Sequence, residues 1–471
     1  MKPIEKKAIS EPPRGMRTFF IIWLGQLGSM IGSGLIGFAL AVWIFEKTGM
    51  ATPFALTGLF AILPRVLLSP LAGAISDRWN RKKIMLISDS LSGVITLATA
   101  ILLLTGRMEV WAVYLISFLG SVFAAFQQPA YTASIVMLVP KDQLSRANSI
   151  TQMGQAIESI LTPLLAGILV TAGGMQAIIL IDVVTYLFAL FTLVIVHIPQ
   201  PERQTEEPQD RLSVYKDMIF GWQYLAERKG LLGLIVYFAL VNFMANFSTA
   251  LIGPLVLSFG TATHFGTAQT LSGLGMLAGS LVMSIWGGPK KNLIRAVIGF
   301  ITLASVGFWV AGWRSSLIFV SAGLFILMFF IPFSTGPSSA IFAKKVAPEV
   351  QGRVFSTRSM ISLSMMPLAY LTSGVLADRV FNPWLEEGGV LAVSFIGRWL
   401  GVGNGRGIGL MFICSGILLM AASGIAYANP QISQMETEIP DAVPDLYDEK
   451  LTQDNKFPEL KKSPSSRDRA G

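Results

Sequence analysis

The sequence of 471 residues is too apolar for a soluble globular protein, because 52% of its residues are hydrophobic, only 14% are charged and the mean hydropathy is +0.60. The net charge of +8 arises from cations spread over short connecting segments, which argues against a nucleic-acid-binding module. One cysteine and two histidines offer no basis for a disulfide framework or a zinc site, so we expect no metal and no cofactor.

Twelve apolar stretches are long enough to cross a bilayer, whose hydrocarbon core of about 30 Å needs about 20 residues of helix. They lie at residues 19–45, 54–75, 84–104, 111–130, 149–171, 177–197, 231–259, 267–286, 294–312, 317–334, 355–376 and 407–428. Gly and Pro occur inside these stretches, as lipid-embedded helices tolerate. We therefore expect an all-α membrane protein with twelve transmembrane helices.

The orientation of the chain follows from its cations. Lys2, Lys6, Lys7, Arg14 and Arg17 precede an apolar run that is too long for a cleaved signal peptide. Lys and Arg are also enriched in alternate connections, and cation-rich connections remain in the cytoplasm. We expect both termini to be cytoplasmic and the protein to lie in the cell inner (plasma) membrane.

A repeat divides the chain into two related halves. Pro129, Pro140, Arg146 and Gly167 correspond to Pro337, Pro348, Arg353 and Gly374, at an offset of 207 or 208 residues. Two pseudo-symmetric six-helix bundles of this kind place a substrate cavity between them. Five regions are predicted: a cytoplasmic N-terminus at 1–18, a bundle at 19–198, a linker with an amphipathic helix at 199–230, a second bundle at 231–428 and a disordered cytoplasmic tail at 429–471.

The connection between the second and third stretches carries the most specific motif, with Gly73, Asp77, Arg78, Arg81, Lys82 and Lys83. It resembles the loop signature of the major facilitator superfamily, although Asn80 stands where that signature has Gly. Asparagine tolerates a left-handed backbone, so the turn can be kept. We expect Gly73 to let neighbouring helices approach closely.

In that family the Asp helps to hold the inner gate shut against the start of the eleventh span. The resemblance therefore implies a gating role for Gly73, Asp77, Arg78, Arg81 and Arg353. The alternative is that the basic residues only anchor the connection on the inner side.

Within the superfamily, the chain from Arg17 to Ala428 resembles the macrolide-efflux-like branch of drug:proton antiporters, which includes siderophore exporters. The resemblance rests on Leu63-Pro64, the run 69–73, Arg146-Ala147-Asn148, Ile181-Asp182, the run 374–378 and the run 405–409. It implies a monomeric exporter of a small amphiphilic molecule, driven by protons and without enzymatic activity. Alternatives are a lipid or lysophospholipid flippase of the same fold and a facilitator without proton coupling.

Two departures weaken the case for proton coupling. The fourth stretch lacks the Arg that many proton-coupled antiporters carry there, and has Phe126, Gln127 and Gln128 near its inner end. The antiporter motif of the fifth stretch is reduced to Thr162, Pro163, Ala166 and Gly167.

Ionisable side chains inside a bilayer are costly and mark candidate functional sites. We identify Arg65, Glu158 and Asp182. Glu158, near mid-membrane, is the candidate proton carrier, and Arg65 the candidate attractor of anionic cargo groups, although the two can instead form a structural pair. For Asp182, nearer the outer face, a hydrogen-bonded structural role is favoured.

Polar side chains are also predicted to line the cavity. These are Gln26 in the first stretch and Asn242 and Asn246 in the seventh, the last two on one helix face. Apolar surface for an amphiphilic cargo is expected from Met30, Phe38, Met244 and Phe247.

Overall fold

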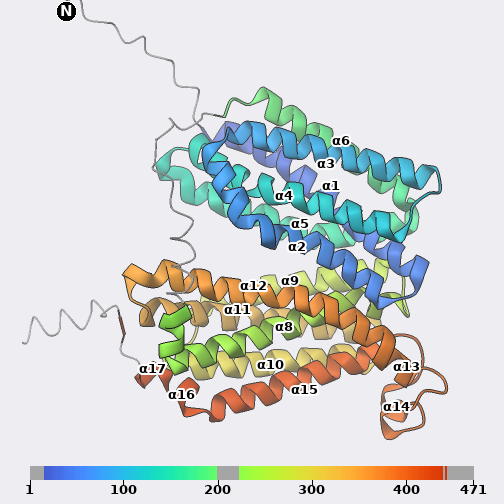
Figure 1. Cartoon of the computed structure of the whole chain (residues 1–471), viewed down its shortest axis with the longest axis vertical. Coiled ribbons are helices and arrows are strands. Elements are labelled where there is room, and N and C mark those ends of the chain that lie inside the picture. The colour runs from blue at the N-terminus through green and yellow to red at the C-terminus, as the bar shows by residue number, and fades with distance from the viewer. Residues whose placement is uncertain (1–14, 199–221, 439–440, 443–471) are drawn as a thin grey trace, which may run out of the picture.

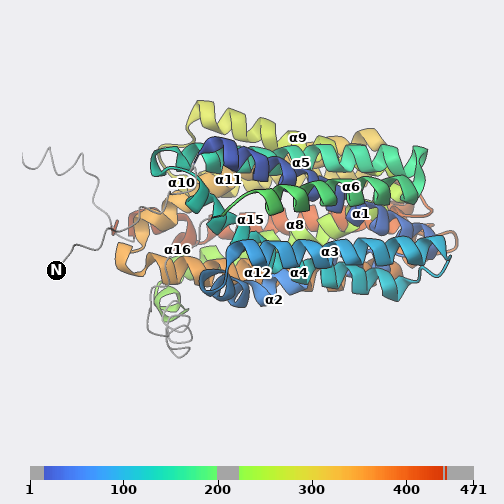
Figure 2. The same cartoon turned by 90° about the horizontal axis from the view of Figure 1, so that it is seen from above.

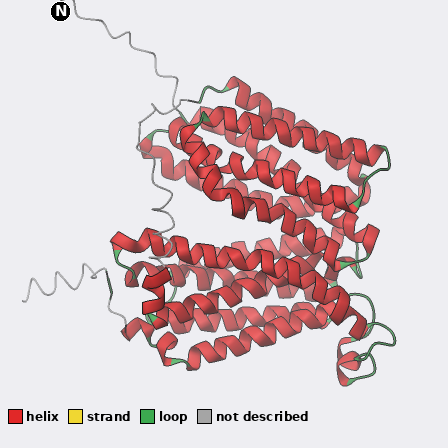
Figure 3. Ribbon diagram, viewed as in Figure 1, coloured by secondary structure: helices red, strands yellow, loops and turns green. Residues whose placement is uncertain are grey.

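The computed structural model describes residues 15–198, 222–438 and 441–442, and these residues are almost entirely helical (Figures 1 and 3). Twelve helices are long and apolar enough to cross a membrane, as the sequence predicted. In the N-terminal half they are α1 (Met16–Thr48), α2 (Ala51–Arg78), α3 (Arg81–Leu104), α4 (Val110–Leu138), α5 (Leu144–Ala172) and α6 (Gly174–Ile195). In the C-terminal half they are α8 (Lys229–Leu257), α9 (Ala262–Trp286), α10 (Leu293–Trp313), α11 (Leu317–Lys345), α12 (Gln351–Leu376) and α15 (Arg406–Ala428).

The two halves lie one above the other in Figure 1, and the view from above in Figure 2 shows their long helices running roughly parallel. Helix α1 begins and α15 ends at the same end of the molecule, called here the terminal end. The connections that follow α1, α5, α8 and α12 lie at the other end, called here the opposite end. These two ends differ in how the halves meet.

The apolar core reflects this difference. One cluster of buried side chains spans both halves and contains the part of α1 between Leu35 and Ile44, together with residues of α8, α9 and α12. A separate cluster, which includes Phe19, Met85 and Leu138, belongs to the N-terminal half alone and lies toward the terminal end. Within the described residues, the halves therefore share a core toward the opposite end and not toward the terminal end.

The predicted repeat appears in the local structure. Pro129 lies inside α4 and Pro337 inside α11. After each of these helices a short 3-10 turn follows, η1 (Lys141–Gln143) in the first half and η2 (Pro348–Val350) in the second. The equivalent elements support two pseudo-symmetric six-helix bundles.

Between α12 and α15 the chain makes an excursion at the opposite end. It contains a π-helical turn, η3 (Ala377–Phe381), followed by α13 (Asn382–Leu385) and α14 (Phe395–Leu400). The Arg406 side chain is 5% exposed and fastens the start of α15 to the end of α10, because its guanidinium donates to Ser315 Oγ at 2.9 Å and Trp313 O at 2.8 Å.

The segment after Ala428, predicted to be disordered, begins instead with two short helices, α16 (Pro430–Ser433) and α17 (Met435–Glu438). The difference has a physical reason, because Ile432 and Met435 are apolar and are buried against glycine positions of α8. The predicted amphipathic helix lies mostly outside the described residues, which resume with helical residues 222–227. Residues 443–471 also lie outside them.

Candidate functional site

A cavity of about 810 Å³ lies inside the N-terminal half. Its lining residues fall between Gln26 and Asp182 in the chain and come from all six helices of that half. The prediction placed the cavity between the halves, and the difference arises from small side chains. Facing positions on α1, α2 and α4 carry Gly34, Gly37, Ala61, Gly120 and Ala124, which leave the space between these helices unfilled.

Four ionisable side chains line this cavity, each from a different helix: Arg65 on α2, Asp89 on α3, Glu158 on α5 and Asp182 on α6. Arg65 and Glu158 lie close enough for their charges to attract each other, so the structure brings this predicted pair together. Both are near the middle of their helices. Glu158 is 14 residues from either end of α5, which at 1.5 Å per residue is about 21 Å.

Asp182 is 3% exposed and is held on one side by α3, because its Oδ2 accepts a hydrogen bond from Thr96 Oγ1 at 2.7 Å. Its other oxygen faces α1 at Gly32, where a Cβ would lie 2.7 Å from Asp182 Oδ1. The carboxylate is thus enclosed between two helices.

Asp89 was missed by the sequence reasoning although it lies inside the predicted stretch 84–104, where any acidic residue is a signal. It is 5% exposed, and its Oδ2 accepts a hydrogen bond from Gln26 Nε2 at 3.2 Å. Gln127 Nε2 donates in turn to Gln26 Oε1 in a short hydrogen bond. Gln26, predicted to line the cavity, does so as the middle member of this Gln127–Gln26–Asp89 chain.

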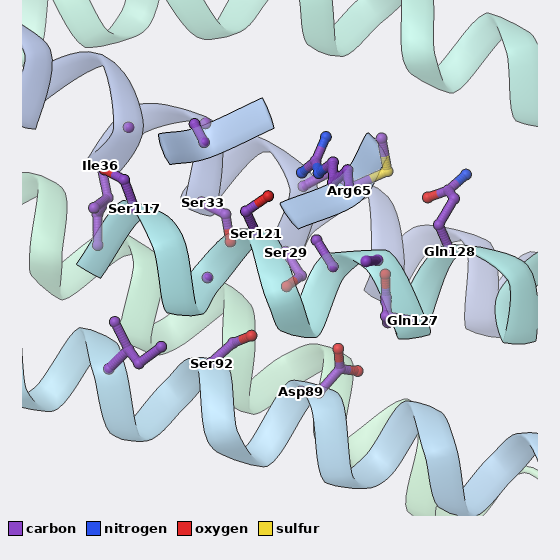
Figure 4. A pocket seen from close by; sticks show the side chains of 18 of the residues that line it. Ser29, Ser33, Ile36, Arg65, Asp89, Ser92, Ser117, Ser121, Gln127 and Gln128 are labelled. Atoms are coloured by element: carbon purple, nitrogen blue, oxygen red, sulfur yellow. The ribbon is translucent and has the colours of Figure 1, made fainter. Parts of the chain in front are cut away.

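Hydroxyl groups also line the cavity and repeat at the spacing of one helix face (Figure 4). They belong to Ser29 and Ser33 on α1, Ser92 and Thr96 on α3, and Ser117 and Ser121 on α4. Figure 4 shows Asp89 and Ser92 projecting from α3 toward the helices that carry these serines. The cavity therefore presents these polar groups within a wall that is mostly apolar.

The other predicted lining residues are placed differently. Asn242 and Asn246 lie on α8 in the C-terminal half and are not among the residues that line this cavity. Each amide donates to its own helix, to Phe238 O at 2.8 Å and to Asn242 O at 2.7 Å. Met30 lines the cavity. Phe38 instead stacks on Phe265 of α9, with ring centroids 4.7 Å apart.

Met244 and Phe247 are buried on α8, and Phe247 belongs to the apolar cluster that spans both halves. They therefore supply no surface to the cavity in the N-terminal half.

The loop between α2 and α3 departs from two expectations. Asn80 has a φ of −64°, so it is not left-handed but caps α3, its Oδ1 accepting from Lys83 N at 3.1 Å. A Cβ at Gly73 would meet no atom within 4 Å, so no helix packs closely on that glycine. Arg81 Nη1 donates to Ala133 O at 3.4 Å, and Arg78 is exposed.

The remaining gating candidates are only partly described. The backbone of Asp77 belongs to α2, but its side chain lies outside the described residues. Arg353 lies in the first turn of α12 at the terminal end, where its carbonyl accepts from Thr357 Oγ1.

The halves are joined at the opposite end through Asp378. Its two carboxylate oxygens accept hydrogen bonds from Ala51 N at 2.8 Å and Thr52 N at 2.7 Å, the first two residues of α2. The N-cap residue of α2 has no side-chain hydrogen bond of its own, so Asp378 supplies a cap from the other half. Gly374, one turn earlier, allows the close approach, because a Cβ there would lie 2.6 Å from Thr52 Cα.

An equivalent contact joins α5 and α9. The hydroxyls of Thr171 and Thr263 lie 2.9 Å apart, and Thr263 Oγ1 donates to Gly167 O at 3.0 Å. Gly167 and Thr171 precede Gly374 and Asp378 by the same 207 residues, so the two contacts are related by the repeat. Among the described residues, one more hydrogen bond crosses between the halves, from Thr270 Oγ1 to Ile160 O.

Comparison with known proteins agrees with this architecture. The family model of the Major Facilitator Superfamily matches residues 22–370. Macrolide efflux protein A of Streptococcus pyogenes is 30% identical over 387 residues, which cover 80% of this chain and 93% of that protein. Enterobactin exporter EntS of Salmonella typhimurium is 25% identical over 303 residues, which cover 62% of this chain and 72% of that protein.

Two solved structures show the same fold. A bacterial homolog of the human lysosomal transporter Spinster, in an inward-facing and unoccupied conformation, has a TM-score of 0.64 at 14% identity and covers 91% of this chain and 98% of its own. An inward-facing bacterial homologue of the iron transporter ferroportin has a TM-score of 0.64 at 16% identity and covers 88% of this chain and 99% of its own. Similarity at these identities concerns the fold alone.

Proposed function

Because the chain belongs to the major facilitator superfamily, a family of membrane transporters rather than enzymes, we propose that it exports a small amphiphilic molecule across the plasma membrane by alternating access. Macrolides and siderophores are the cargo classes that its relatives suggest. The observation that carries the proposal is a cavity with both polar and apolar lining inside a molecule whose two halves, within the described residues, are joined by hydrogen bonds from the middle toward the opposite end.

The direction of access follows from the two ends. The cation-rich connections predict that the terminal end faces the cytoplasm. Hydrogen bonds between the halves, within the described residues, lie from the middle of the bundle toward the opposite end. We infer a conformation that is closed toward the outside and gives access from the cytoplasm, the state in which an exporter takes up its cargo. Rocking of the two halves, which would part them at the opposite end, would then give the cargo a way out to the external side.

Proton exchange is the proposed energy source, with Glu158 as the carrier. A carboxylate at mid-membrane is stabilised by the nearby Arg65, and a proton on Glu158 removes that attraction. Uptake and loss of the proton would thus change how α5 and α2 attract each other. This gives proton binding a route to the packing of the helices that form the cavity.

The test is cargo-stimulated proton movement in liposomes that contain the purified full chain, with a panel of macrolides and siderophores. We expect proton flux that requires a cargo and that falls at least about tenfold in Glu158→Gln. Glu386→Gln is the matched control, because it makes the same change on an exposed residue outside the cavity.

Cargo transport against a gradient that survives in Glu158→Gln would refute the coupling role. Transport of lipid, with no transport of any compound in the panel, would show a flippase instead. Transport only down a gradient would show a facilitator.

A further inference from the structure

The charge of the cavity is unbalanced. Its lining carries one cation, Arg65, against three acidic side chains, Asp89, Glu158 and Asp182. Arg65 is paired electrostatically with Glu158, so two acidic groups remain whose described hydrogen-bond partners are all neutral. An enclosed site with excess negative charge favours a cation in its interior.

The amide chain beside Asp89 is polarised in one direction. Gln127 donates to Gln26, and Gln26 donates to Asp89, so both amide groups turn their donors toward the carboxylate. Neutral donors arranged in this way stabilise the ionised carboxylate without cancelling its charge. The two amides thus offset part of the cost of burying a charge at Asp89, and a cation in the cavity would offset more of it.

The surroundings of Asp89 distinguish between kinds of cation. Among the described residues, no three His, Cys, Asp or Glu side chains come together as metal ligands. The wall around Asp89 instead offers hydroxyls, with Ser92 one turn away on the same helix and Ser29 and Ser33 on α1. A single carboxylate with hydroxyl neighbours suits an ammonium group, which donates several hydrogen bonds and needs no fixed ligand cage.

We propose that Asp89, held by the Gln127–Gln26 chain, binds the protonated amine of an organic cation, so that the cargo of this cavity is an amphiphilic amine. This inference rests on the proposed export function and names its cargo class. The cavity of about 810 Å³ has room for a larger, uncharged body beside the amine, in contact with the apolar part of the wall and with its hydroxyls.

The experiment measures equilibrium binding to the purified full chain in lipid nanodiscs. The probes are erythromycin, whose tertiary amine is protonated at neutral pH, its uncharged N-oxide of nearly the same shape, and tetraphenylphosphonium. A charge-assisted hydrogen bond predicts that wild type binds erythromycin at least about tenfold more tightly than the N-oxide. Asp89→Asn should reduce this preference to about twofold or less and weaken tetraphenylphosphonium binding about tenfold.

Two variants separate recognition from general effects. Asp89→Glu keeps the charge and should keep the preference, which controls for a folding defect. Asp182→Asn also removes one negative charge from the cavity, but this carboxylate is enclosed between α3 and α1. It should therefore reduce the preference for erythromycin over the N-oxide less than Asp89→Asn does. An equal loss in both variants would show an overall charge effect and overturn the assignment to Asp89.

Other outcomes are equally decisive. Equal affinity of wild type for amine and N-oxide, a preference that persists in Asp89→Asn, or displacement of the amine by millimolar sodium would refute the inference. A preference for erythromycin over its N-oxide that depends on Asp89, in a protein that exports no compound, would support the inference while refuting the proposed export. Export that does not depend on Asp89 would support the proposed export and refute the inference about Asp89.

Discussion

In the N-terminal half, four ionisable side chains from four helices line one cavity, whereas in the C-terminal half the prominent charges are cations bonded within their own half. Lys345 lies 2.7 Å from Asp441 Oδ1, and Arg358 donates to Ser338 Oγ at 2.9 Å and lies over the ring of Phe342. Related bundles thus use buried charge in two ways. Charges that face a cavity remain available to cargo and protons, and charges that face the protein fasten helices together.

This comparison extends to the junction between the halves. Repeat-related positions supply a carboxylate, Asp378, at one crossing and a hydroxyl, Thr171, at the other. The carboxylate comes from the half without the described cavity. We infer that the N-terminal half is specialised for recognition and that the C-terminal half closes the opposite end against it.

The largest effect on transport is expected at the close contact between α12 and α2, where the backbones of the two halves touch. In Gly374→Leu the new side chain must displace the backbone of Thr52, because even a Cβ would lie 2.6 Å from its Cα. Overpacking of this kind costs about 3 kcal/mol, so transport by liposomes should fall about a hundredfold as the opposite end fails to close. Gly299→Leu is the matched control, because a Cβ at Gly299 meets no atom within 4 Å. Transport by Gly374→Leu within twofold of that control would disprove the role of this crossing.

A smaller effect is expected for a C-terminal cation that faces the protein. Arg406→Gln removes buried, charge-assisted hydrogen bonds to Ser315, Trp313 and Gly312, which should lower the free energy of unfolding by about 2 kcal/mol. Thermal unfolding in detergent measures this loss, and cargo affinity should stay within twofold of wild type. A change in affinity without a change in stability would break the distinction between the two halves.

The carboxylate at the junction should have an intermediate effect. In Asp378→Asn one of the two acceptors becomes a donor that faces a backbone N–H, which should weaken closure of the opposite end by about 1.5 kcal/mol. Spin labels at the exposed positions Arg107 and Glu387, in a Cys414→Ser background, report the distance between the halves at that end. The population with the long distance should rise about tenfold. An unchanged distance distribution would show that Asp378 does not hold the closed state.

The helices could be predicted because the thickness of the bilayer sets their length. The loop motif and the repeat could be predicted because their residues recur at fixed spacings in the sequence. The cavity was not, because its position depends on which small side chains, such as Gly34 and Gly120, face each other across different helices. Asn242 and Asn246 share a helix face as predicted, yet they bond to their own backbone.

Some of the functional residues carry a signal in the sequence, and others carry none. Asp89 and Arg358 carry such a signal, because each is an ionisable residue inside a predicted transmembrane stretch. No sequence pattern indicates that Asp378 caps α2, since its partners are more than 320 residues away in the chain.

The smallest effect is expected at the repeat-related crossing. Thr171→Val is nearly isosteric and removes one neutral hydroxyl, so closure should weaken by about 0.5 kcal/mol and the long-distance population should rise two- to threefold. Thr263 keeps its own bond to Gly167 O, which limits the loss. The same spin-label pair measures both variants, so the ratio of their effects compares the carboxylate with the hydroxyl directly. If Thr171→Val opened the molecule as much as Asp378→Asn, the two crossings would contribute equally to closure. The proposed division of roles between the halves would then hold for the cavity but not for the junction.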